Sequence, residues 1–211
     1  MKKFSVAAVL AASLVSSAVA IDLDGFFVGA SGDYNFKSQL KGDWYLEPLN
    51  MSSKFDFDES NFGLGLKIGY DFGEWRIYEA YSHTFESKSN NNIVSPLLLM
   101  PGLSEETKWS SNDFILGADW TPKFSLGGID FKGIVGAFGG LSILDVKYLG
   151  TSAAGNLTAD YTQNGFIYGL RLGGIYEINK NNEIELGFKF DQAMYQETNI
   201  ALIQHSLTLL L

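Results

Sequence analysis

The stretch from Asn61 to Phe72 reads Asn-Phe-Gly-Leu-Gly-Leu-Lys-Ile-Gly-Tyr-Asp-Phe. Large apolar side chains occupy every second position from Phe62 onward, and the positions between them hold only glycine, Lys67 and Asp71. A period of two predicts a β-strand, because successive side chains of a strand point to opposite faces. The apolar face of such a strand meets a second apolar layer in a soluble protein, or lipid in a membrane barrel.

The same alternation recurs along the chain and predicts eight strands. Most of them are 11 to 15 residues long, whereas soluble strands are typically ~5–6 residues and tilted membrane strands need ~9–11. In seven of the eight, no charge interrupts the apolar face in mid-strand. Length and charge placement therefore favour the membrane. The predicted strands cover residues 25–36, 61–72, 75–85, 110–120, 129–143, 165–178, 183–195 and 199–211.

The third predicted strand, residues 75–85, is compatible with either register. A carboxylate near the middle of the membrane is costly on the lipid-facing side of a strand. We therefore place Glu79 in the interior and Arg76 outward at the rim, where its long side chain can reach the headgroups. The other residues that this register turns inward are Ile77, Tyr81 and His83.

The N-terminus has the pattern of an export signal. Lys2 and Lys3 precede an uncharged apolar run, which ends in the small-x-small sequence Ala18-Val19-Ala20. This pattern predicts a signal peptide over residues 1–20, cleaved after Ala20, and a mature domain over residues 21–211. Beyond it, the sequence contains no apolar stretch of the ~20 residues that a spanning helix needs. A membrane-embedded mature chain would therefore be a closed barrel.

The composition excludes several classes of partner and site. Removal of residues 1–20 leaves 13 basic residues against 24 acidic ones, a net charge of about −11. This excess of negative charge argues against a nucleic-acid partner. The chain has no cysteine, so no disulfide or zinc–thiolate site is available. We expect no cofactor.

The connections between the predicted strands indicate the orientation. Long gaps follow the first, third and fifth strands, and short ones follow the second, fourth, sixth and seventh. Long outer loops and short periplasmic turns are typical of membrane barrels, and they place both chain ends on the periplasmic side. All four prolines fall between predicted strands, as expected for a residue that cannot donate to a β-ladder.

This arrangement resembles the small eight-stranded outer-membrane barrels of Gram-negative bacteria, such as the OmpA membrane domain and the OmpX type. The end of the chain, from Ile203 to Leu211, resembles the C-terminal signal read by the outer-membrane assembly machinery. It departs from that signal in ending with Leu211 instead of an aromatic residue, and in carrying His205 on its apolar face. The resemblance implies an all-β, eight-stranded antiparallel transmembrane up-and-down β-barrel. It also implies a monomer in the cell outer membrane, in contact with lipids including lipopolysaccharide.

The interior of such a barrel is just wide enough to be filled by side chains. Buried charges must pair or carry a large desolvation cost, so we expect a core of ion pairs that plugs the lumen. The alternative is a narrow water-filled path, for which the inward glycines leave space. The predicted inward charges are Asp33, Lys67, Asp71, Glu79, Asp113, Asp130, Lys132, Arg171, Glu185, Lys189 and Asp191.

Residues for catalysis or metal binding are few. Lipid A deacylases of the outer membrane use His, Ser and Glu near the outer rim, and His83 has hydroxyl and carboxylate neighbours in the sequence. The His-x-Ser spacing of that family is absent, because position 85 is Phe. The acidic run 56–59 could bind a divalent cation, although such runs are more often solvated loops. We expect no enzymatic activity and no metal site.

An apolar segment lies in a predicted outer loop, and exposed apolar patches usually mark contacts. It could bind a surface partner or the outer leaflet, or pack as a lid on residues 44–51. We therefore expect a structural or surface-interaction (adhesin-like) role through long extracellular loops. A small porin-like channel for ions or small solutes is the alternative, and a lipid A-directed hydrolase ranks last. The apolar residues of the segment are Ile93, Val94, Leu97, Leu98, Leu99, Met100 and Leu103.

Overall fold

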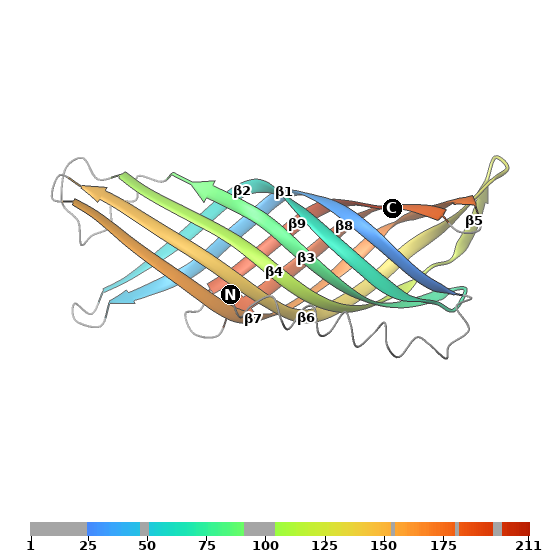
Figure 1. Ribbon diagram of the computed structural model, residues 1–211, viewed down its shortest axis with the longest axis horizontal. Helices are drawn as coiled ribbons and strands as arrows, with labels where there is room; N and C mark the ends of the chain where they lie inside the picture. The colour runs from blue at the N-terminus through green and yellow to red at the C-terminus, as the bar shows by residue number, and fades with distance from the viewer. Residues whose placement is uncertain (1–24, 47–50, 91–103, 153–154, 180–181, 196–199) are drawn as a thin grey trace.

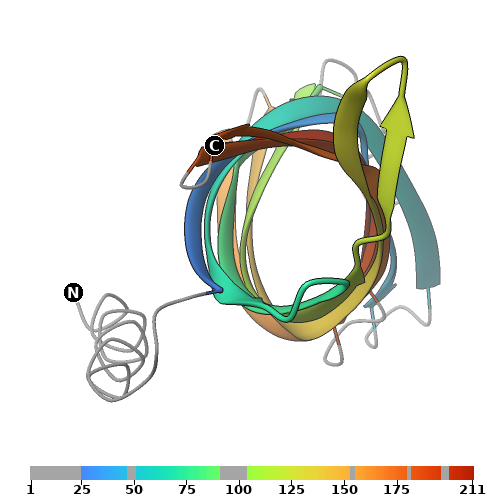
Figure 2. The same ribbon diagram turned by 90° about the vertical axis from the view of Figure 1, so that its right-hand side faces the viewer.

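The computed structural model describes residues 25–46, 51–90, 104–152, 155–179, 182–195 and 200–211. The strands are antiparallel to their neighbours, and pairing of β4 with β6 closes eight of them into a ring (Figures 1 and 2). The predicted eight-stranded barrel is confirmed. The ninth strand, β5, is a short partner of β6. The strands are β1 (Phe26–Leu46), β2 (Met51–Asp71), β3 (Trp75–Ser89), β4 (Ser104–Trp120), β5 (Lys123–Leu126), β6 (Ile129–Ser152), β7 (Gly155–Asn179), β8 (Asn182–Tyr195) and β9 (Ile200–Leu210).

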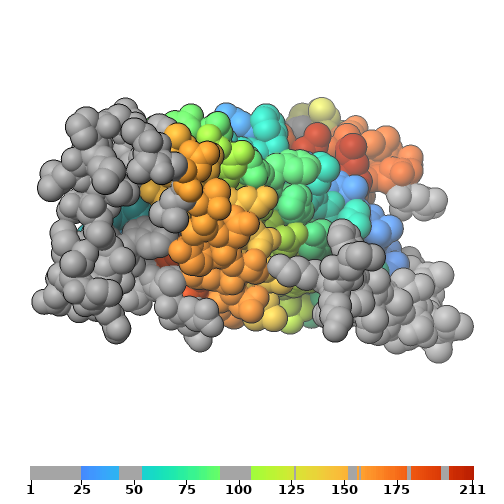
Figure 3. Space-filling model, turned by 60° about the vertical axis from the view of Figure 1, so that its left-hand side comes forward, coloured from blue at the N-terminus to red at the C-terminus, as the bar shows by residue number. Residues whose placement is uncertain are grey.

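The strands are strongly tilted. If one starts at Phe26 and steps from each residue to its partner on the next strand, the path goes once around the ring. It returns to β1 at Lys37, which is 11 residues beyond Phe26. A barrel needs such a stagger to close, and Figure 1 shows the strands running obliquely to the long axis of the molecule. In the space-filling view of Figure 3, side chains of neighbouring strands cover one face of the wall. In the described residues, no helix is long and apolar enough to cross a membrane.

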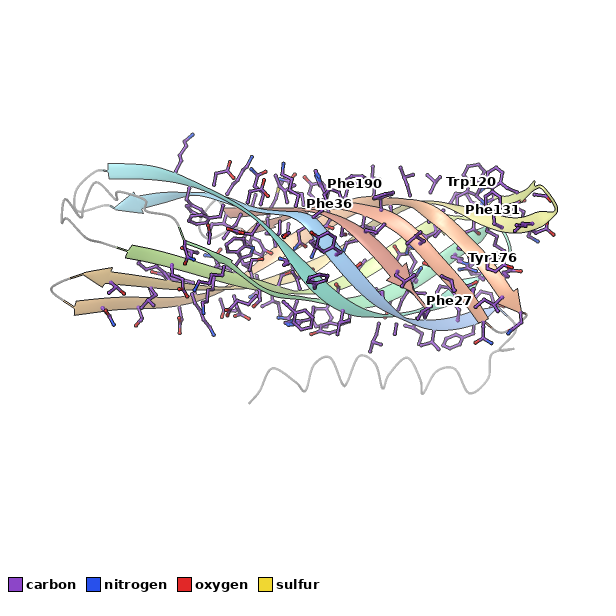
Figure 4. All side chains as sticks on the ribbon, turned by 90° about the horizontal axis from the view of Figure 1, so that it is seen from above. Phe27, Phe36, Trp120, Phe131, Tyr176 and Phe190 are labelled. Carbon is purple, nitrogen blue, oxygen red and sulfur yellow. The ribbon has the colours of Figure 1, made fainter. Side chains whose placement is uncertain are left out.

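The outside of the ring is an apolar belt. In the strand that opened the sequence analysis, Leu66 is 62% exposed on the outer face and Lys67 is 4% exposed inside. Figure 4 shows Trp120, Phe131 and Tyr176 near the end that carries the short turns, as expected for an aromatic girdle at one membrane interface. So much exposed apolar side chain over every strand of the ring is the surface of a protein embedded in lipid.

Several strands are longer than predicted. Residues 37–46, 51–60, 144–152 and 155–164, which we expected to be loops, continue the strands beyond the belt. They do so because hairpin partners keep pairing and inward side chains such as Phe57 and Leu144 are buried. The acidic run 56–59 therefore lies in β2. The predicted signal peptide and the predicted contact segment from Ile93 to Leu103 lie outside the described residues.

The register predicted for the third strand is wrong. Arg76 is inside and 2% exposed, whereas Ile77 is 51% exposed and Glu79 is exposed on the lipid-facing side. The tight turn before β3 pairs Asp71 with Arg76, and the side chains of these two residues make an ion pair inside the ring. Asp130 is also outside the lumen, exposed on the β5–β6 hairpin.

Candidate functional site

The barrel interior is the candidate site, and the part nearest the short turns, the end that we expect to be periplasmic, is a network of charges. Glu185 on β8 lies at its centre and accepts hydrogen bonds from Arg171 Nη2 at 2.6 Å and Lys67 Nζ at 3.1 Å. Asp119 on β4 lies 3.4 Å from Arg171 Nη1 and 3.5 Å from Lys67 Nζ. Two cations and two carboxylates from four strands therefore neutralise one another within the lumen, as buried charges must.

A second ion-pair group lies at the rim that carries the short turns. Arg76 donates two hydrogen bonds to Glu183, at 2.6 and 2.8 Å, and two to Asp71, at 2.7 and 2.9 Å. Lys132 Nζ lies 3.3 Å from Asp71 and 2.8 Å from Glu177. Arg76 Nη1 also lies 3.3 Å from Glu185, so the rim group and the deeper network are continuous. Paired guanidinium–carboxylate contacts of this kind are directional and strong.

Aromatic rings fill the space around these cations. Lys67 Nζ lies 4.3 Å from the ring centre of Tyr78 and 5.3 Å from that of Phe27, and the Arg171 guanidinium lies 5.4 Å from Tyr78. Such cation–π contacts stabilise desolvated cations. Gly117 leaves room for Tyr78, because a Cβ at position 117 would lie 2.3 Å from its ring.

The middle of the lumen is polar and partly hollow. Asp113 accepts a hydrogen bond from Ser142 Oγ at 2.6 Å, Asp33 accepts one from Thr208, and Lys189 Nζ lies 3.7 Å from Asp191. A cavity of about 60 Å³ reaches from Lys67 to this layer. That volume can hold a few water molecules between polar groups.

The outer part of the lumen combines aromatic and aliphatic side chains with uncharged polar ones, among them Ser38, Ser87 and Gln204. The rings of Phe55, Phe57 and Trp109 stack in series, with centroid distances of 5.4 and 6.0 Å. Leu40 and Leu144 pack in the same buried cluster. The interior therefore has three layers, counted from the rim with the short turns: ion pairs, a small polar cavity, and a packed layer of rings, aliphatic side chains and uncharged polar groups.

The structure places nine of the predicted inward charges inside the ring, and only Glu79 and Asp130 lie outside it. Sequence reasoning missed Arg76, Asp119, Glu177 and Glu183 as members of the network. A signal for Arg76 was present, because the tight turn at 73–74 sets Asp71 opposite Arg76 across the hairpin. Cross-strand pairs of opposite charge favour such a register.

His83 does not meet the groups that catalysis would require. Its ring faces outward, 3.0 Å from Asn112 Oδ1 and edge-on to Phe85, whereas Ser82 is buried on the inner face. The Glu86 carboxylate pairs with Lys108. No group of three His, Cys, Asp or Glu side chains arranged to hold a metal occurs among the described residues.

No family model and no curated protein matches this sequence. Among solved structures, it is similar to Ail, the attachment invasion locus protein of Yersinia pestis, with 13% identity, coverage of 89% of this chain and 99% of Ail, and a TM-score of 0.45. Its closed ring of eight antiparallel strands and its exposed apolar belt give the protein the fold of the small outer-membrane β-barrels. Neisserial surface protein A (NspA) is 14% identical over 89% of this chain and 96% of its own, with a TM-score of 0.40. The N-terminal barrel of Pseudomonas aeruginosa OprF is 13% identical over 86% and 97%, with a TM-score of 0.32. These similarities concern the fold, and the membrane assignment rests on the apolar belt of this chain.

Proposed function

We propose that this protein is a non-conducting anchor in the outer membrane that presents the outer ends of its strands, and the loops between them, to surface partners. The observation that carries the proposal is the filled lumen. Ion pairs occupy its periplasmic third and stacked rings occupy its outer part. A pore would need a continuous water-filled path, and the ion pairs and packed side chains fill the lumen instead.

The outer ends of the strands support the surface role. Pairing of β2 with β3 ends at Gly63 and Thr84, although β2 continues outward to Met51. Pairing of β7 with β8 ends at Gly165 and Tyr195, although β7 begins at Gly155. Within the described residues, these outer segments pair on one side only, and in Figure 1 the β1–β2 hairpin separates from the other strands at its outer end. An open strand edge can hydrogen-bond an extended peptide segment of a partner.

Single-channel recording in planar bilayers tests the closed lumen. We expect no steady conductance from the wild-type protein. A triple variant serves as the positive control. Trp109→Ala and Phe57→Ala remove the ring stack, and Lys67→Ala weakens the ion-pair network, so this variant should conduct. Ion-selective steps in the wild type that change when Lys67 or Arg171 is replaced would contradict the proposal.

Adhesion measurements test the surface role. We expect bacteria that display the protein to adhere to cultured host cells better than bacteria displaying a variant in which residues 145–162 are replaced by a two-residue turn. Retention of the apolar belt and the ion-pair network makes this variant a matched control for folding. Equal adhesion by the two strains would contradict a role for the outer β6–β7 hairpin.

A small channel is the second candidate, and the cavity between Lys67 and Lys189 favours it. Its lining includes Arg171 and Asp33, so its walls carry both signs of charge. Conduction would require the ring stack above it to move. The recordings described for the closed lumen distinguish this candidate from the anchor.

A further inference from the structure

The hairpin formed by β5 and the first residues of β6 is amphipathic along its whole length. Its cross-strand pairs alternate between apolar and polar. The pairs are Lys123 with Lys132, Phe124 with Phe131, Ser125 with Asp130, and Leu126 with Ile129. Because side chains of a strand alternate between faces, one face of the hairpin carries Phe124, Ile129 and Phe131, and the other carries the polar residues. The rings of Phe124 and Phe131 stack with their centres 5.5 Å apart.

The apolar face of this hairpin continues the lipid-facing belt. Phe131 and Ile129 have the same strand parity as Val135, which is exposed on the belt and is the cross-strand partner of Trp120. Phe124 is 50% exposed and Ile129 is 58% exposed. A hairpin that simply projected into the periplasm would present these side chains to water.

The hairpin leans away from the barrel axis, as Figures 1 and 2 show from two directions. When a strand bends outward at the rim, the side that faced lipid lower down comes to face the surface of the adjacent leaflet. The base is fixed, because Lys132 pairs with Asp71 and Glu177 inside the rim. The tip is a tight turn at Gly127 and Gly128, which have φ values of 62° and 85°; glycine adopts such values without strain.

We propose that this hairpin lies on the periplasmic leaflet and inserts Phe124, Ile129 and Phe131 at the boundary between headgroups and acyl chains. Its occupant is phospholipid, because the apolar face is continuous with a surface already covered by lipid. The exposed Lys123 and Asp130 on the opposite face then stay in water, as the polar face of an interfacial amphipathic element does. Docked in this way, the hairpin fixes the depth of the barrel in the membrane.

Site-directed spin labelling tests this inference, since the chain has no cysteine of its own. Residues 21–211 with Phe124→Cys or Ser125→Cys are folded into vesicles of phosphatidylethanolamine and phosphatidylglycerol. Neighbouring positions on opposite faces form the matched pair, and Val135→Cys is the lipid-facing reference. The measurement is the accessibility of each nitroxide to oxygen, which concentrates in lipid, relative to a water-soluble nickel chelate.

We expect the oxygen-to-nickel ratio at position 124 to approach that at position 135 and to exceed that at position 125 several-fold. A ratio at position 124 as low as that at position 125 would mean that the hairpin stands in water, and would overturn the inference. If Phe124→Cys does not fold, Ile129→Cys and Asp130→Cys form an equivalent pair on the other strand, with the same two outcomes.

Discussion

The two halves of β2 have opposite polarity. In the half within the membrane, Leu64 and Leu66 face outward and Lys67 faces the lumen. In the half beyond the belt, Phe55 and Phe57 face the lumen, and the residues that alternate with them, Lys54, Asp56 and Asp58, are exposed. The solvent outside the wall explains the inversion. Where lipid surrounds the ring, apolar side chains are stable outside; where water surrounds it, they are stable only inside.

The largest expected effect comes from breaking the charged half of the lumen. Glu185→Gln removes the carboxylate shared by Lys67, Arg76 and Arg171 and leaves buried positive charge without its main partner. Loss of one member of a buried ion pair costs about 3–5 kcal/mol. We expect urea unfolding in vesicles to show a loss of that size.

The control for Glu185→Gln is an ion pair on the outer surface. Lys88 Nζ lies 2.7 Å from Glu106, and both side chains are partly exposed. Lys88→Gln should change the free energy of unfolding by less than about 1 kcal/mol, as exposed ion pairs do. Equal losses of unfolding free energy in the two variants would mean that the buried network stabilises the barrel no more than an exposed ion pair does.

Trp109→Ala disrupts the ring stack in the outer half of the lumen. Trp109 is fully buried, stacks on Phe57 and donates a hydrogen bond to Ser38. Truncation of a buried aromatic side chain costs about 3 kcal/mol or more. The same unfolding assay measures the loss, and the ion-pair network should keep this single variant non-conducting. Conductance from Trp109→Ala alone would show that the ring stack blocks ion flow and that the ion-pair network does not.

Glycine substitutions compare the inside and outside of the wall. A Cβ at Gly140 would lie 1.9 Å from the backbone carbonyl oxygen of Phe114, whereas a Cβ at Gly32, on the outer face, meets nothing within 4 Å. We expect Gly140→Ala to cost about 2 kcal/mol, because the backbone must shift. Gly32→Ala should be neutral or slightly stabilising. Reversal of that order in unfolding measurements would contradict the assigned faces.

The substitution Glu79→Leu tests the corrected register of β3. Glu79 is exposed on the lipid-facing side between its partners Ile68 and Leu116. A carboxylate costs less than a basic residue at such a position, so we expect Glu79→Leu to stabilise the folded barrel by about 1 kcal/mol. An interior Glu79 would give the opposite sign in the same assay, because its removal would break ion pairs.

The smallest effect concerns the charges outside the membrane. Hydrogen bonds from Lys88 and Lys108 lower the pKa of Glu106 below its usual 4.5, and the bond to Glu106 raises the pKa of Lys108 above its usual 10.5. Because the pKa of Glu106 is lowered, its contribution to stability is complete above pH 4.5 and is lost as the pH falls. Because the pKa of Lys108 is raised, its contribution is complete below pH 10.5 and is lost as the pH rises. This cluster should therefore persist between those limits. In Lys88→Gln, the titration midpoint of the Glu106 carboxyl carbon, followed by NMR, should rise toward 4.5.

Sequence alone was sufficient for the strand faces wherever the alternation was clean. In β2, β7 and β8, the apolar residues at alternate positions are exposed to lipid, because the period of two is a local property of an extended backbone. Sequence also contained the inversion of β2, since its apolar residues change from odd positions (Phe55, Phe57) to even ones (Phe62, Leu64). We interpreted the outer segment as a loop, because it did not continue the pattern of the membrane half.

Tertiary structure decided what local alternation could not. Both faces of β3 carry polar and apolar residues, so its own pattern leaves the register open. Closure of the ring selects it by bringing Glu183, 107 residues away in the sequence, to the Arg76 guanidinium. The same closure brings Glu185 to Lys67 and Arg171. Which residues face lipid thus follows from the local backbone, whereas which charges of distant strands neutralise one another follows only from the closed barrel.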